Sequence, residues 1–305
     1  MSYSIPTVIA IDWGSSNFRA YLLDQRYKIL DCIKHNEGIK QQQNQDHAAI
    51  LKRLLQSWQT KIDEHQVPII MAGMIGSNLG WYEAPYLACP LPLSSLAQHL
   101  YTFISPWDTN AYIVPGVKVD DQQNADVMRG EEILILGAQQ LSDTAIYCLP
   151  GTHSKWATLN GNSLATFVTL MTGELYAVLL QHTLLGLDLP KQQYDEEWFN
   201  NGVLSAQEQG EVITQLFQVR ARRLLKQLPV NVAASYLSGL LIGNEINTML
   251  AHIDNPDKIV TMVATSQQLS ESYQQVFTLL NTPVKIVDGE SAFLQGIRVI
   301  MRELK

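Results

Sequence analysis

Charged residues are scarce in this chain of 305 residues, and positive charge is scarcer than negative charge. Asp, Glu, Lys and Arg make up 16% of the sequence, whereas roughly 25% is typical of soluble domains. The formal net charge of −8 argues against nucleic acid as a partner, because a phosphate backbone requires a basic surface. It is compatible with a nucleotide, which backbone amides and a metal ion can bind.

Cysteine and long apolar runs are also scarce. The three cysteines, Cys32, Cys89 and Cys148, lie in separate apolar segments without the spacing of a metal site. We therefore expect buried, reduced thiols. No segment approaches the ~20 apolar residues needed to span a bilayer, and the first residues show no basic segment followed by an apolar core. These absences predict a cytoplasmic protein with no membrane partner.

An acid between two apolar runs is the first informative feature. Residues 8–11 have the brevity and β-branched content of a buried strand, and residues 18–23 form a returning strand. Asp12 ends the first strand, and the turn that follows it consists of Gly14, Ser15, Ser16 and Asn17. Such a turn can offer amides and hydroxyls to phosphate oxygens, and the acid can hold Mg²⁺ through its waters. The alternative is an ordinary polar hairpin.

The same pattern recurs about half a chain later. Residues 145–149 form an apolar run, residues 150–154 a segment of small residues, and residues 155–159 a returning strand. In both halves, three strands are followed by a helix, a strand and a helix. This order predicts a duplicated α/β architecture with two domains, residues 1–137 and 138–305.

Four further segments carry local predictions. The polar residues 120–126 predict a loop, and residues 94–103 predict a short helix. Ser291 is a suitable N-cap for the closing helix. Glu131 and Glu132 precede an apolar run, as expected for the first turn of a helix, where negative charge suits the helix dipole.

The two turns resemble the phosphate motifs of sugar kinases in the actin, Hsp70 and hexokinase superfamily. Six segments resemble one family more closely, the 2-dehydro-3-deoxygalactonokinases. They are Ala-Ile-Asp-Trp-Gly-Ser-Ser-Asn (10–17), Met-Ala-Gly-Met-Ile-Gly-Ser-Asn (71–78), Val-Met-Arg-Gly-Glu-Glu (127–132), Pro-Gly-Thr-His-Ser-Lys-Trp (150–156), Met-Thr-Gly-Glu-Leu (171–175) and Leu-Ser-Gly-Leu-Leu-Ile-Gly-Asn-Glu (237–245). The resemblance implies a two-domain actin-like ATPase fold (a duplicated ribonuclease H-like fold) with a central interdomain cleft. It also implies ATP-dependent phosphorylation of the 6-hydroxyl of 2-dehydro-3-deoxy-D-galactonate in galactonate catabolism.

The resemblance extends to the cofactors, ATP and Mg²⁺. Asp12 resembles the acid that orients the metal ion. The phosphate ligands it implies are Gly14, Ser15, Ser16, Asn17, Gly151, Thr152 and Ser154. Arg19 could neutralise phosphate charge, with a solvated strand residue as the alternative. Gly239 and Gly243 would make room for the adenosine, with helix packing as the alternative.

Phosphoryl transfer also needs an acceptor for the proton of the attacking hydroxyl. Our candidates, in order, are Glu131, Asp126, Glu132 and Asp121. The last of these begins an Asp-Gln-Gln sequence that resembles a motif of related sugar kinases. One of the two adjacent glutamates could instead serve only the helix dipole.

A sugar-acid substrate carries a carboxylate, so its pocket should contain a cation or backbone donors. The candidates for the carboxylate are Arg129, His153 and Lys155, and a solvent-facing strand lysine is the alternative for Lys155. Candidates for the sugar hydroxyls are Gly76, Ser77, Asn78 and Glu83.

Other functions remain open at this point. A kinase of the same fold for another sugar or sugar acid is the nearest alternative. A non-catalytic nucleotide-dependent sensor is the second, and it would need phosphate binding without a proton acceptor. A Rossmann oxidoreductase is disfavoured, because no predicted strand is followed by G-x-G-x-x-G. The sequence does not decide the oligomeric state, and a homodimer is compatible with it.

Overall fold

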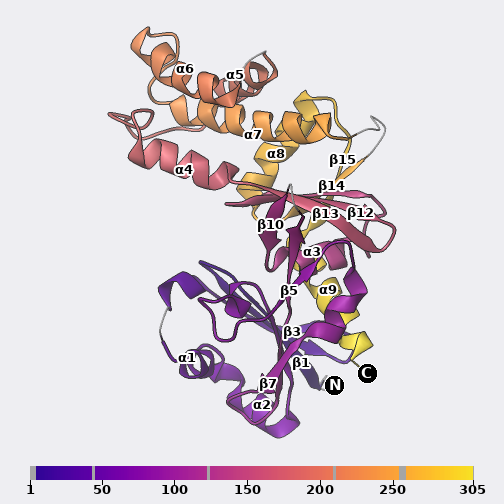
Figure 1. Ribbon diagram of the computed structural model, residues 1–305. Helices are drawn as coiled ribbons and strands as arrows, with labels where there is room; N and C mark the ends of the chain where they lie inside the picture. The colour runs from indigo at the N-terminus through magenta and orange to yellow at the C-terminus, as the bar shows by residue number, and fades with distance from the viewer. Residues whose placement is uncertain (1–4, 43–44, 122–123, 209–210, 254–258, 305) are drawn as a thin grey trace. The chain divides into compact units, whose positions relative to one another are not determined.

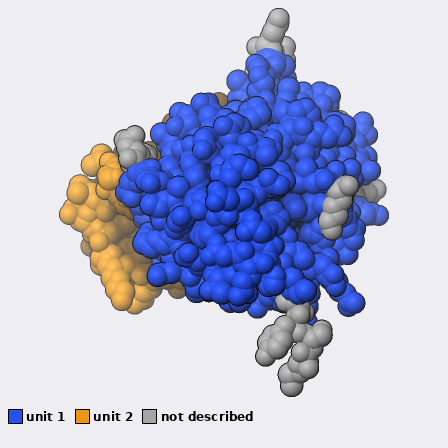
Figure 2. Space-filling model, turned by 90° about the horizontal axis from the view of Figure 1, so that it is seen from below, with its two compact units in different colours: residues 1–143, 159–167, 289–305 blue, residues 144–158, 168–288 orange. Residues whose placement is uncertain are grey.

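The computed structural model forms two compact units. Unit 1 comprises residues 1–143, 159–167 and 289–305, and unit 2 comprises residues 144–158 and 168–288 (Figure 2). The structure describes residues 5–42, 45–121, 124–208, 211–253 and 259–304. The predicted boundary after Gly137 stays a prediction. The units differ from it mainly because the closing helix groups with unit 1.

Unit 1 is built on a six-stranded mixed sheet in the order β3-β2-β1-β4-β8-β7 (Figure 1). Its strands are β1 (Pro6–Trp13), β2 (Phe18–Asp24), β3 (Ile29–His35), β4 (Ile69–Ala72), β7 (Tyr101–Ile104) and β8 (Asn110–Ile113). β1 is antiparallel to β2 and parallel to β4. Because parallel strands end at the same edge of a sheet, Asp12 lies beside Ala72, at the start of the loop that follows β4.

Smaller elements complete unit 1. A second sheet has the order β10-β9-β5, and β6 pairs with β13. These strands are β5 (Tyr86–Ala88), β6 (Leu91–Pro92), β9 (Gly116–Asp120), β10 (Ala125–Met128) and β13 (Ser163–Leu170), of which residues 163–167 belong to unit 1. The helices are α1 (His47–Leu54), α2 (Gln59–His65), α3 (Glu131–Ala138) and α9 (Gly289–Glu303), with 3₁₀ turns η1 (Ile39–Gln41), η2 (Gln56–Trp58), η3 (Met74–Gly76) and η4 (Leu93–His99).

Helices α3 and α9 approach each other unusually closely. A Cβ atom on Gly137 would lie 1.7 Å from the carbonyl oxygen of Ala292, and one on Gly296 would lie 2.2 Å from that of Ile133. Only glycine fits where two helix backbones are this near. The contact holds α3, and with it the Glu131 end of that helix, within unit 1.

Unit 2 repeats the strand pairing of unit 1. β11 (Ile146–Leu149) is antiparallel to β12 (Ser154–Asn160) and parallel to β14 (Val260–Ala264), which is parallel to β15 (Val284–Asp288). The helices are α4 (Thr172–His182), α5 (Glu196–Gln207), α6 (Val212–Leu224), α7 (Ala233–Ala251) and α8 (Gln267–Leu279). An antiparallel hairpin followed by two parallel strands therefore occurs in each unit, which agrees with the predicted duplication.

Several local predictions need correction. The helix predicted over residues 94–103 is the shorter η4, followed by β7. Part of the predicted loop 120–126 belongs to β10, because pairing with β9 overrides its polar composition. Ser291 lies inside α9, which starts directly after β15. Cys32 is exposed rather than buried, because it lies on the edge strand β3.

Two features are absent from the described ranges. None of their helices is both long and apolar enough to cross a bilayer. They also contain no group of three or more His, Cys, Asp or Glu side chains placed to bind a metal ion by themselves.

Candidate functional site

The first hairpin loop consists of residues 14–17, between β1 and β2. Hydrogen bonds from the chain that follows β3 fix its position. The amides of Ile39 and Lys40 donate to the carbonyls of Gly14 and Ser15 at 3.0 and 3.1 Å. In the described part of the chain, the amides of Ser15 and Ser16 have no acceptor. Amides fixed in this way form an anion-binding site.

The second hairpin loop, residues 150–153 between β11 and β12, is held by the first turn of α4. The amide of Glu174 donates to the carbonyl of Thr152 at 3.0 Å, and a Cβ on Gly173 would lie 2.7 Å from the carbonyl oxygen of Gly151. No described residue accepts from the amides of Gly151 and Thr152. Each unit therefore carries one hairpin loop with amides available to an anion.

Gly14 and Gly151 are not required by packing within the protein. A Cβ on Gly14 would lie 3.8 Å from its nearest neighbour, the carbonyl oxygen of Asn17. A Cβ on Gly151 would lie 3.6 Å from the carbonyl oxygen of His153. Both distances are ordinary contacts, and neither glycine has a positive φ. The space beside both loops is therefore open, as close approach by a phosphate would require.

Asp12 is the second-last residue of β1 and pairs with Arg19 across the hairpin. Arg19 Nη1 lies 3.3 Å from Asp12 Oδ2, and about a third of each side chain is exposed, 36% for Arg19 and 34% for Asp12. Burial raises the pKa of the Asp12 carboxyl, Arg19 opposes that shift, and the negative charge of Glu131 adds to it. The predicted metal ligand and the first candidate for the base therefore lie within electrostatic range of each other.

Two glycines with positive φ bring these carboxylates together. Gly73, after β4, has φ +97°, and Gly130, before α3, has φ +107°. A Cβ on Gly73 would lie 2.8 Å from the carbonyl oxygen of Trp13, and one on Gly130 would lie 3.2 Å from the Cα of Gly73. Three backbone segments thus meet in van der Waals contact, and glycine alone tolerates both the contact and the conformation.

The adjacent glutamates at the start of α3 have different environments. Glu132 is fully buried, and both its carboxylate oxygens accept from the amide of Gly130, at 2.9 and 2.7 Å. Burial raises the pKa of Glu132 to about 8. Glu131 is half-buried, and its Oε2 accepts from the amide of Arg129 at 3.1 Å. Glu132 therefore fixes the turn that precedes α3 through the amide of Gly130, and the dipole role that the sequence left open for one of the pair stays a prediction.

The other two carboxylate candidates lie on or next to the β9–β10 hairpin. Asp126 is on β10 opposite Val119, and its Oδ1 accepts from the amide of Val127 at 2.7 Å. Asp121 is exposed, and its Oδ1 accepts from the amide of Asn124 at 2.7 Å. Gln122 and Gln123 of the Asp-Gln-Gln sequence lie outside the described residues. Of these candidates, Glu131 is the one whose negative charge raises the pKa of Asp12.

Arg129 and Gly76, both predicted to contact the sugar acid, lie together. The buried guanidinium of Arg129 donates from Nη2 to the carbonyl of Ala84 at 2.7 Å and stacks 4.2 Å from the ring centre of Tyr86. A Cβ on Gly76 would lie 3.0 Å from Arg129 Nη1. Nη1 is buried and has no hydrogen-bond partner in the described part of the protein.

The remaining predicted sugar ligands in unit 1 differ in the exposure of their side chains. The hydroxyl of Ser77 is buried and donates to the carbonyl of Met74 at 2.7 Å, so it closes the loop. Asn78 and Glu83 are exposed. Ser77 therefore contributes to loop shape, whereas Asn78 and Glu83 have side chains available to solutes.

The three residues that follow Thr152 are all constrained. Lys155 is 4% exposed, and its Nζ donates to the carbonyl of His153 at 3.2 Å, so it is not a solvent-facing strand lysine. His153 Nε2 lies 2.6 Å from Glu174 Oε2. Ser154 corrects a prediction, because its fully buried hydroxyl lies 2.8 Å from the hydroxyl of Tyr273 and does not face a ligand.

Known proteins resemble this chain in sequence along nearly its whole length. The sequence profile of the family described as 2-keto-3-deoxy-galactonokinase matches residues 12–300. The chain belongs to this family. The 2-dehydro-3-deoxygalactonokinase of Escherichia coli strain K12 is 38% identical over 292 residues, which cover 96% of each chain. The family predicted from the sequence is confirmed.

Solved structures confirm the predicted fold class as well. A candidate 2-dehydro-3-deoxygalactonokinase from Sinorhizobium meliloti superimposes with a TM-score of 0.88 at 31% identity, covering 97% of this chain and 99% of that one. A candidate N-acetylglucosamine kinase from Porphyromonas gingivalis has a TM-score of 0.50 at 13% identity, covering 95% and 98%. The fold is thus the two-domain actin-like α/β fold of sugar kinases.

In this family member, the two glycines predicted to make room for adenosine pack against a neighbouring helix. A Cβ on Gly239 would lie 2.0 Å from the carbonyl oxygen of Phe199 on α5, and one on Gly243 would lie 2.9 Å from the Cβ of Ala206. The structure therefore gives both glycines the helix-packing role that the sequence left as the alternative.

A pocket on a different face of α7 reaches the second hairpin loop. This α4–α7–α8 pocket has a volume of about 260 Å³. It is lined by Gly151, Thr172, Gly173, Tyr176, Ser238, Leu241, Ile242, Ser266, Gln268, Leu269, Ser272 and Tyr273. The sequence prediction missed it, although residues 171–175 and 237–245, which supply part of its wall, were among the family segments.

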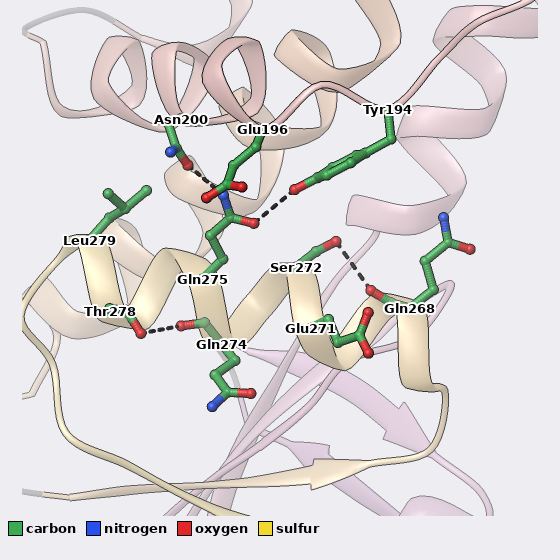
Figure 3. A pocket seen from close by; sticks show the side chains of 10 residues that line it. All are labelled: Tyr194, Glu196, Asn200, Gln268, Glu271, Ser272, Gln274, Gln275, Thr278 and Leu279. Carbon is green, nitrogen blue, oxygen red and sulfur yellow. Dashed lines mark hydrogen bonds between the residues drawn. The ribbon is translucent and has the colours of Figure 1, made fainter.

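A pocket of about 710 Å³ lies between α5 and α8 (Figure 3). Two of its amide side chains and a tyrosine hydroxyl bind one another. Tyr194 donates to Gln275 Oε1 at 2.8 Å, and Gln275 Nε2 donates to Asn200 Oδ1 at 2.6 Å. Its lining includes two acids, Glu196 and Glu271, and no cation or glycine. This composition does not suit a phosphate.

Proposed function

We propose that the chain transfers the terminal phosphoryl group of ATP to the 6-hydroxyl of 2-dehydro-3-deoxy-D-galactonate, giving the 6-phosphate in galactonate catabolism. The observation that carries this proposal is the family match over residues 12–300. The E. coli relative that bears this substrate in its name is 38% identical along nearly the whole chain. A phosphotransferase with an alcohol acceptor must also bind the phosphates of ATP, and the two hairpin loops offer backbone amides for this.

ATP fits the residues that are present. The hairpin-loop amides of Ser15, Ser16, Gly151 and Thr152 would bind phosphate oxygens. The α4–α7–α8 pocket would receive the adenosine, because it combines apolar walls with hydroxyls and opens at Gly151. Asp12 would hold Mg²⁺ through its waters, and the ion would supply charge neutralisation on the phosphates when bound. Arg19 would add positive charge beside them.

Glu131 is our proposal for the group that accepts the proton of the 6-hydroxyl. Its carboxylate is partly accessible and stands in the first turn of α3, near Asp12. Asp126 stays the second candidate. Because ATP is supplied inside the cell, we also propose a cytoplasmic location.

Residues from several segments of the chain would bind the sugar acid. Arg129 supports this role with a buried Nη1 donor that is not used by the described residues, next to Gly76. Asn78 and Glu83 would contact hydroxyls. Lys155 and His153 remain candidates for the substrate carboxylate.

A coupled ADP-release assay tests the proposal across a panel of 2-keto-3-deoxy sugar acids and plain aldoses. We expect turnover with the galactonate-derived acid and a product phosphorylated at C6 by ³¹P and ¹³C NMR. Activity on the gluconate-derived acid or glucose alone would point to another sugar kinase. Nucleotide binding without turnover on any sugar would point to a sensor.

A further inference from the structure

Glu245, in the middle of α7, is a carboxylate that no part of the proposed reaction uses. Its side chain is 2% exposed. It accepts hydrogen bonds from Trp156 Nε1 at 2.9 Å, from the hydroxyl of Tyr273 at 2.7 Å, and from the hydroxyl of Thr172. A buried carboxylate is tolerated when donors such as these replace its water.

The three donors come from three different elements of unit 2. Trp156 is on β12, two residues after its start, Thr172 is the first residue of α4, and Tyr273 is on α8. Tyr273 also pairs with the hydroxyl of Ser154 at 2.8 Å. Thr172 and Tyr273 themselves line the α4–α7–α8 pocket. Glu245 therefore joins the strand that leaves the second hairpin loop to two walls of that pocket.

The chemistry of the donors explains why an acceptor is needed at this position. An indole N–H can only donate, so Trp156 requires an acceptor whatever the hydroxyls do. Burial raises the pKa of Glu245, and the hydrogen bonds from Thr172, Trp156 and Tyr273 oppose that shift. A glutamine would keep one acceptor oxygen but would replace the other with a donor. It would thus satisfy part of the network.

A movement at Thr172 would reach the second hairpin loop directly. The next residue, Gly173, is so close to the carbonyl oxygen of Gly151 that a Cβ there would lie 2.7 Å away. The amide of Glu174 donates to the carbonyl of Thr152 at 3.0 Å. The first turn of α4 and the loop amides must therefore shift together.

We propose that Glu245 is a positioning residue for the nucleotide, which fixes β12, α4 and α8 so that the second hairpin loop and the α4–α7–α8 pocket fit one ligand. This inference rests on the proposed function. It implies that loss of the Glu245 network weakens ATP binding more than sugar-acid binding, since the proposed sugar-acid ligand Arg129 has no contact with this network in the described part of the chain.

The test compares E245A, E245Q, Y273F and W156F with Y236F. Y236F is a matched control, since it removes one buried hydrogen bond from the same helix, between Tyr236 and Ser205 at 2.8 Å. For each variant we would measure kcat, the KM of each substrate, the Kd of ADP by calorimetry, and Tm. We expect the ADP Kd and the KM for ATP to rise about 10- to 100-fold in E245A, as a misplacement of about 1 Å can cause.

E245Q should lie between E245A and wild type, and Y236F should keep both constants within about twofold, as a hydrogen bond remote from the site allows. If E245A fails to fold, E245Q, Y273F and W156F give the same answer. An ADP Kd in these three within about twofold of wild type, or an equal rise in both KM values, would overturn the inference. A wild-type protein that binds no ADP would instead overturn the proposed function.

Discussion

Replacing Gly14 or Gly151 with alanine separates ligand binding from folding. A Cβ at these positions would meet nothing closer than 3.8 Å and 3.6 Å, so the folded protein has room for it. Alanine also restricts the unfolded chain, which stabilises a compatible site by about 0.4–1 kcal/mol. We therefore expect G14A and G151A to have a Tm equal to or above that of the wild type.

ATP binding should respond in the opposite direction. The methyl group would occupy the space through which a phosphate oxygen reaches the neighbouring amides. A hydrogen bond to a charged group contributes about 1.5–3 kcal/mol, and every 1.4 kcal/mol corresponds to about tenfold. Loss of one such bond predicts a rise of about 10- to 100-fold in the KM for ATP and in the Kd of ADP.

Two other glycines serve as matched controls because their Cβ atoms would clash with backbone. In G137A the new atom would lie 1.7 Å from the carbonyl oxygen of Ala292, and in G239A it would lie 2.0 Å from that of Phe199. Forcing such contacts costs about 1–3 kcal/mol or more. We expect these variants to melt at lower temperature, with the KM for ATP near the wild-type value in the fraction that folds.

Calorimetric ADP binding and thermal melting of the four variants decide the matter. Weak binding with intact stability in G14A and G151A, and the reverse in G137A and G239A, is the expected pattern. If G14A and G151A bind ADP as the wild type does, the two loops do not approach phosphates, and the assignment of both is wrong.

Two further predictions concern the start of α3. E131Q should lower kcat about 100-fold or more, because general-base catalysis contributes a factor of about 10²–10⁴ to the rate. E132Q should change kcat little. Equal activity of E131Q and wild type would exclude Glu131 as the base. Stability should also fall as pH rises between about 4.5 and 8, because the unfolded chain releases the Glu132 proton near 4.5 while the folded protein holds it until about 8. Urea unfolding at pH 5 and pH 8 should show that loss in the wild type and a smaller loss in E132Q, and equal losses would show that Glu132 does not cause it.

The two hairpins could be predicted from sequence because their signals are local. A short β-branched run, a turn of small residues and a second apolar run specify a hairpin without reference to the rest of the chain. Asp12 and Gly151 were found in this way. The recurrence of the pattern then indicated the duplication, and the family resemblance depended on the same segments.

The roles of neighbouring polar residues could not be predicted in this way, because burial depends on elements distant in sequence. Ser154 lies in a turn of small residues, as a phosphate ligand would, but the hydroxyl of Tyr273, 119 residues later, binds its hydroxyl. Lys155 could have faced solvent, but it is buried against its own hairpin loop. Gly14 and Gly239 are the same residue type, and only the distance to other backbones separates an open loop from a helix contact.

The carboxylates of this chain differ in the hydrogen-bond donors that surround them. Glu132 accepts twice from one amide, and Glu245 accepts from three side chains, so both are satisfied within the protein. Asp12 pairs with Arg19 alone among the described side chains, and its own side chain stays about a third exposed at 34%. A carboxylate saturated with internal donors holds structure, whereas one that is partly exposed beside another acid can take up a cation or a proton. On that criterion Asp12 and Glu131 are the pair suited to chemistry, and a magnesium ion would neutralise their negative charge.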